Sequence, residues 1–231
     1  MESKNSSLAT GVVAVIVGVV IGGLVGYGVG NTKKDDSVPS SSVSSTAPKT
    51  DTKAASLRVL LNNLNGQHAD VASGTLRAGF DGSPMFDPSA KALDVNSVAL
   101  SKSVGAVYGP EAEAKFLEIW RSHITFFVNY TVASKAGDQA GMDKAVQDLE
   151  GYVVAISDLF GGATGLPKDA VAMLITTHVA NLKETLDKHA AGDFPASYAA
   201  QQETRDQITT KVADTLAGAI VKQNTGNKFT D

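Results

Sequence analysis

Three of the four histidines in this 231-residue chain stand 55 residues apart, and three glycines keep the same spacing, each 14 residues after its histidine. The residues concerned are His68, His123 and His178, with Gly82, Gly137 and Gly192. A fixed spacing of this size is the signature of a repeated supersecondary unit. A helix, a glycine turn and a second helix account for its length. The spacing therefore predicts three copies of a helical hairpin.

The periodicity of apolar residues predicts six helices between residues 54 and 223, followed by a frayed tail at 224–231. Asp87 before Pro88 is typical of a helix N-terminus, and the glycine-rich stretch 161–165 is typical of a loop. The expected helices run from about 55 to 80, from 87 to 107, from 110 to the turn at 135–138, from 139 to 160, from about 167 to the turn at 192–193 and from about 195 to 223. The fold class we expect is all-α, an antiparallel six-helix bundle of three αα-hairpins.

The N-terminal region predicts a membrane anchor. After a polar start at residues 1–8, residues 9–30 carry no charge. As a helix this run reaches about 33 Å, enough to cross a hydrocarbon core of about 30 Å. A cleavable signal peptide is the alternative, but its apolar region is shorter and ends at a small-residue cleavage site. Residues 31–53, rich in Ser, Thr and Pro, are expected to form a flexible stalk.

Four glycines in the predicted span stand four residues apart, which places them on one stripe of the helix: Gly18, Gly22, Gly26 and Gly30. Such a stripe lets a second helix approach closely, so it predicts self-association in the bilayer. Lysines flank the span on both sides, so the positive-inside rule leaves its orientation open. The order of anchor, stalk and C-terminal domain is typical of a single-pass protein whose domain lies outside the cytoplasm.

Composition and motifs exclude several classes of function. The net charge is −4 and no basic cluster is present, which argues against a nucleic-acid partner. Cysteine is absent, so disulfides, thiolate metal ligands and cysteine nucleophiles are excluded. No His-Glu-x-x-His motif, Gly-x-Ser-x-Gly elbow or phosphate-binding loop occurs. We therefore expect no enzyme but a non-catalytic interaction or structural module.

The repeated histidines suggest an alternative function as a metal- or cofactor-binding bundle. Each histidine lies on the apolar face of its helix, at the same distance from a glycine turn. In an up-and-down bundle the three imidazoles would share one level and could bind Cu, Zn or Fe. Carboxylates on the intervening helices could add ligands, as in metal-binding bundles. The candidates are Asp94, Glu150 and Asp206.

A structural role for the histidines is the competing interpretation. A buried imidazole can simply donate a hydrogen bond to a hydroxyl or carbonyl in the core. Each histidine is followed after seven residues by a residue with a hydroxyl group, and these are Thr75, Tyr130 and Thr185. Such a hydroxyl could serve a histidine of the next helix. A flat or solenoidal stack of helices would also keep the three imidazoles apart.

The segment 103–133, SVGAVYGPEAEAKFLEIWRSHITFFVNYTVA, resembles bacterial surface or secreted helical-repeat proteins often labelled copper-amine-oxidase-like. The closing run 213–223, ADTLAGAIVKQ, is similar to the end of the same proteins, and with the histidines the resemblance covers most of 57–223. It implies a surface-located helical protein without established activity. The relatives carry a further histidine in the last helix, where this chain reads 204–207 as TRDQ. An oxidase activity is not implied, because Thr131 follows Asn129-Tyr130 and no His-x-His pair exists.

Overall fold

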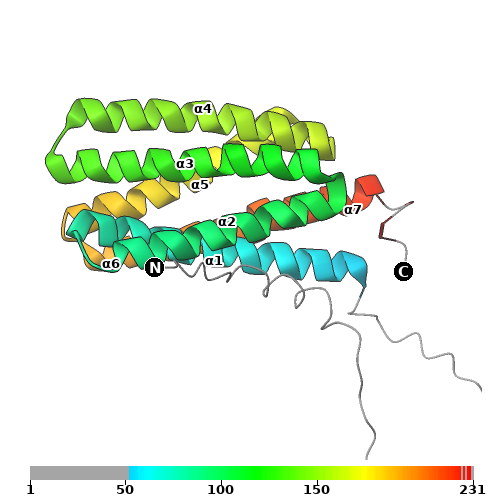
Figure 1. Ribbon diagram of the computed structural model, residues 1–231, viewed down its shortest axis with the longest axis horizontal. Coiled ribbons are helices and arrows are strands. Elements are labelled where there is room, and N and C mark those ends of the chain that lie inside the picture. Colours follow the sequence, from blue (N-terminus) through cyan, green and yellow to red (C-terminus); the bar gives the residue numbers. More distant parts are fainter. Residues whose placement is uncertain (1–51, 225, 227, 230–231) are drawn as a thin grey trace, which may run out of the picture. The chain divides into compact units, whose positions relative to one another are not determined.

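The computed structural model describes residues 52–224, 226, 228 and 229, which all belong to one compact unit. Figure 1 shows a bundle of long helices without a strand in this part of the chain. The elements are α1 (Lys53–Asp81), α2 (Phe86–Tyr108), α3 (Pro110–Ala136), α4 (Gln139–Thr164), α5 (Lys168–Ala190), α6 (Phe194–Gln207), the π-helix η1 (Ile208–Ala213) and α7 (Asp214–Asn224). The all-α class and the helical bundle are therefore confirmed.

The predicted membrane span at 9–30, its glycine stripe and almost all of the predicted stalk lie outside the described residues. Within the part that the structure describes, no helix combines the length and the apolar character that crossing a bilayer requires.

Glycine turns close the three hairpins at one end of the bundle, on the left in Figure 1. Gly82, Gly137 and Gly192 have φ angles of 69°, 67° and 78°, in the left-handed region that favours glycine. The helix after the second and third turn begins with an aspartate cap. Asp138 Oδ1 accepts a hydrogen bond from Gly141 N, and Asp193 Oδ1 accepts one from Ala196 N.

Two predicted helix limits and the continuity of the last predicted helix are wrong. The second helix begins at Phe86 rather than at Asp87, because the Ser83 carbonyl and hydroxyl accept from the Phe86 and Met85 amides and start the helix early. Most of the predicted loop 161–165 is helical, and only Gly165 has a positive φ, of 72°. The predicted last helix is interrupted by η1, a feature that apolar periodicity does not indicate.

The first helices of the hairpins, α1, α3 and α5, contact one another as well as their own partners. Two apolar clusters fill the bundle along its length. One surrounds Trp120 and Ile156, and the other surrounds Phe127 and Leu186. Along α3 and α5 the first cluster precedes the histidine and the second follows it. The histidines therefore occupy the level between two apolar layers.

Replacing Gly137 by alanine should lower the free energy of unfolding by about 1–2 kcal/mol, because a side chain at positive φ strains the backbone. No atom would clash with the added methyl group, so the effect isolates the backbone strain. Gly151→Ala is the matched control in the exposed middle of α4, where alanine should stabilise by about 0.5–1 kcal/mol. Urea denaturation followed by circular dichroism measures both changes. Equal effects of the two substitutions would contradict the turn assignment.

Candidate functional site

The structure brings the three repeated histidines together in the middle of the bundle. His68 on α1, His123 on α3 and His178 on α5 are at most 1% exposed. The ring centroid of His68 lies 5.5 Å from that of His123 and 5.8 Å from that of His178. Because α1, α3 and α5 contact one another, equal distances from the glycine turns put the rings at one level. A flat stack that separates the histidines is therefore excluded.

Two aromatic side chains complete the surroundings of the cluster. The Trp120 ring centroid lies 4.8 Å from the centroids of both His68 and His123. Tyr152, from α4, stacks on His123 at 4.5 Å with an interplanar angle of 29°. Neither side chain is among the candidate site residues that the sequence analysis names. The available signal was that Trp120 precedes His123 by three residues and so shares its helix face.

None of the six ring nitrogens of the cluster has a hydrogen-bond partner among the described residues. The hydroxyl groups expected to serve them are engaged elsewhere. Thr75 and Thr185 donate to the carbonyls four residues earlier, at 2.8 and 3.0 Å, and Tyr130 donates to Asp187 Oδ1 at 2.8 Å. The expectation that these hydroxyls hydrogen-bond the histidines is therefore wrong. The cluster is polar, buried and unsatisfied.

Burial keeps the three imidazoles neutral. It lowers the pKa of His123 to about 3, with a further lowering by His178 and a partial opposing effect from the Trp120 backbone, which does not reach hydrogen-bond geometry. Burial lowers the pKa of His178 to about 4. The pKa of His68 falls well below its ordinary value for the same reason, and His123 and His178 lower it further. Neutral imidazole is the form that binds metal ions.

The predicted carboxylates do not join the histidines. Asp94, Glu150 and Asp206 are all exposed. Asp94 instead accepts two hydrogen bonds from the Arg121 guanidinium, at 2.8 and 3.0 Å. Within the described ranges, no three His, Asp or Glu side chains already surround a common point at metal-binding spacing. Each carboxylate belongs to the polar face of its helix, which periodicity could have indicated.

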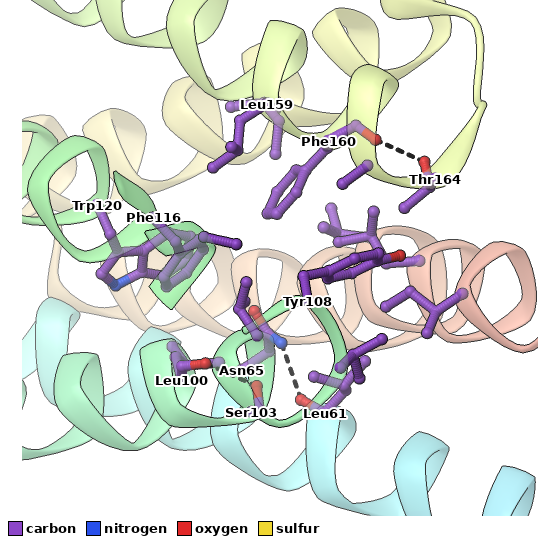
Figure 2. Close-up of a pocket in the computed structure, with 18 of the residues that line it drawn as sticks. Leu61, Asn65, Leu100, Ser103, Tyr108, Phe116, Trp120, Leu159, Phe160 and Thr164 are labelled. Carbon is purple, nitrogen blue, oxygen red and sulfur yellow. Dashed lines mark hydrogen bonds between the residues drawn. The ribbon is translucent and has the colours of Figure 1, made fainter. Parts of the chain in front are cut away.

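An apolar cavity of about 180 Å³ adjoins the cluster (Figure 2). His178, Trp120 and Tyr152 form part of its wall, and most of the remaining wall is aliphatic or aromatic. The wall draws on residues from α1, α2, α3, α4, α5, η1 and α7. Sequence reasoning did not predict this cavity. His178 is thus shared by the histidine cluster and the wall of an apolar space.

Comparisons of the chain with protein-family models, curated proteins and solved structures found no match. They give no support to the resemblance to copper-amine-oxidase-like helical proteins. Functional inference therefore depends on the geometry of the site.

The metal-free protein should lose stability as the pH falls below the ordinary histidine value of 6.5. Below this pH the histidines of the unfolded chain bind protons, whereas the buried histidines of the folded cluster stay neutral. Each histidine therefore lowers the free energy of unfolding by up to about 1.4 kcal/mol for each pH unit of acidification. Three such histidines give up to about 4 kcal/mol per unit between roughly pH 6 and 4. Urea denaturation at several pH values measures this slope.

His123→Phe removes one of the three titrating groups, so the free energy of unfolding should depend less steeply on pH, by up to about one third of the slope. Ile156→Val, a change at a buried position without a titrating group, should lower stability equally at every pH. A slope that is unchanged in His123→Phe would contradict the assignment of neutral buried imidazoles.

Proposed function

We propose that the helical domain is a non-catalytic binding module that holds a transition-metal ion between His68, His123 and His178. The observation that carries this proposal is the cluster of three buried imidazoles, none of which has a hydrogen-bond partner in the part of the chain that the structure describes. A buried polar group without a partner costs about 1–3 kcal/mol. A metal ion would give each imidazole a ligand bond in place of the missing hydrogen bond.

Two of the ring separations in the cluster are close to those of a metal site, but the ring nitrogens are not arranged around a common point. An imidazole nitrogen binds zinc at about 2.0–2.1 Å, so two rings on one ion have centroids on the order of 5 Å apart. The observed separations of 5.5 and 5.8 Å are slightly larger. Because the ring nitrogens do not yet surround a common point, binding requires the rings to turn toward one another. Imidazole donors suit zinc, copper and iron.

The proposal also includes the location of this module at a membrane. We place the helical domain outside the cytoplasm, on a single membrane span at 9–30 and a stalk at 31–53, because of the uncharged run and the Ser/Thr/Pro-rich segment after it. Self-association through Gly18, Gly22, Gly26 and Gly30 belongs to the same proposal. The three-copy hairpin repeat also stays a prediction, supported by the shared spacing of histidines and glycines.

The full-length chain should retain about one zinc or copper ion per molecule after loading and dialysis, and His123→Phe should retain almost none. Phenylalanine is a flat apolar ring, somewhat larger than imidazole and without its nitrogens, so this variant should still fold although the larger ring costs some stability. Elemental analysis gives the stoichiometry, and circular dichroism verifies folding. His189→Gln is the matched control, because His189 pairs with Asp81 at 2.8 Å and lies outside the cluster. A metal-free wild-type protein after loading with zinc, copper and iron would refute the metal site.

A charge in the centre of the predicted span should release the chain from membranes. Val17→Arg costs about 2.5–3.5 kcal/mol of insertion free energy, whereas Val17→Leu is a neutral control. Carbonate extraction of cell membranes, followed by detection of the chain in pellet and supernatant, measures the effect. Recovery of wild-type protein in the supernatant would show that 9–30 does not anchor it.

A further inference from the structure

The apolar cavity has the size of a small-molecule site. Its volume of about 180 Å³ exceeds the roughly 150 Å³ that suffices for a benzene molecule in an engineered cavity. Close-packed protein interiors contain few voids larger than a water molecule. A space of this size between well-packed helices therefore suggests a ligand with about the bulk of a substituted ring or a medium-length chain.

The cavity has an outer and an inner end. Val107, Tyr108 and Ala112, where α2 passes into α3, are half-buried and mark the end nearest the surface. Trp120 and Tyr152, at the histidine cluster, are 4% and 3% exposed. Figure 2 shows Trp120 and Tyr108 on opposite sides of the cavity. A ligand would thus enter beside Tyr108 and reach toward the cluster.

The residues that line the cavity favour an uncharged ligand. Among residues 52–224, no Asp, Glu, Lys or Arg side chain lines the cavity, so a carboxylate or an ammonium group would be buried without a countercharge. Most of the polar wall groups are already engaged within the protein. The groups that donate hydrogen bonds elsewhere are Asn65 to the Leu61 carbonyl, Ser103 to the Leu100 carbonyl, Thr164 to the Phe160 carbonyl and Tyr108 to Gln223.

Trp120 Nε1 and the ring nitrogens of His178 have no partner in the wall, and neither has the Tyr152 hydroxyl. It forms no hydrogen bond with the described residues, although the side chain is 3% exposed and lines the cavity. A phenol is a hydrogen-bond donor at neutral pH, and leaving it unpaired in an apolar space costs free energy. An acceptor oxygen on the ligand would satisfy it.

The π-helix η1 contributes to the same wall. Ile208 and Val212, at its beginning and near its end, both line the cavity. A π-turn adds a residue to the helix and is poorly suited to regular packing, which is why such turns concentrate at functional sites. Its position here is an independent sign that the space is a site and not a packing defect.

We propose that this cavity binds a small uncharged molecule with an apolar body and one acceptor oxygen, such as a medium-chain ketone. The oxygen accepts the Tyr152 hydroxyl and the apolar body extends toward Tyr108. This site goes beyond the proposed metal function and does not depend on it. Of the histidine cluster, only His178 lines the cavity.

Trp120 provides the readout, because it is the single tryptophan of the chain and lies in the cavity wall. Titration of the full-length chain with 2-octanone in the presence of EDTA should change the Trp120 emission in a saturable way. Octanoate, which has the same chain length and a charge, should bind at least about tenfold more weakly. Tyr152→Phe should weaken 2-octanone binding about 2- to 10-fold and leave nonane binding unchanged.

Ala112→Leu fills the cavity and should abolish the signal, whereas Ala114→Leu, two residues away on the exposed face of α3, should leave it intact. If Ala112→Leu unfolds by circular dichroism, Val104→Phe repeats the filling test from α2. Absence of a saturable change with both 2-octanone and nonane would overturn the site. Equal binding in the filled and control variants would overturn its location, and an unaltered ketone affinity in Tyr152→Phe would overturn the acceptor assignment. Because EDTA removes metal throughout, these outcomes are separate from failure of the metal proposal.

Discussion

Three unpaired imidazoles at the level where α1, α3 and α5 meet are the constraint on which the rest of the structure depends. Each buried imidazole without a partner costs about 1–3 kcal/mol, which a core of leucines would avoid. The apolar layers around Trp120 and Phe127 offset this cost on either side of the cluster. The glycine turns keep the three rings at one level. The cluster therefore holds six of the thirteen buried side-chain polar atoms that lack a hydrogen-bond partner among the described residues.

Cluster and cavity form one continuous feature, because His178 belongs to both. A metal ion held by three histidines keeps a coordination position open. Trp120 and Tyr152 contact the cluster and also line the cavity. In the proposed metal-bound state, a ligand of the apolar cavity would therefore approach the ion from the side of Tyr152. The proposed metal site and the proposed ligand site therefore have His178, Trp120 and Tyr152 in common, although each site can be tested without the other.

Residue spacing in the sequence predicts where a side chain lies along its helix, but not which other helices it meets. The spacing of His68, His123 and His178 from the glycine turns predicts their height along the bundle, and the structure places them at one level. Spacing along a helix does not determine how helices are arranged around an axis. The contact of Tyr152 with His123 depends on that arrangement, as does the engagement of Thr75 with its own helix instead of a histidine. The early start of α2 and the π-turn η1 arise from local hydrogen bonds and packing that an apolar pattern does not encode.

Charge balance narrows the kind of ion that the proposed site would hold. Neutral imidazoles bring no negative charge, cysteine is absent, and the candidate carboxylates are at the surface. Burial raises the pKa of Tyr152, so its hydroxyl stays neutral and offers no countercharge either. A divalent ion would leave twice the uncompensated charge of a monovalent one inside an apolar core, and the cost of burying charge rises steeply with its magnitude. Charge balance therefore favours either a monovalent ion or a divalent ion that enters together with an anion.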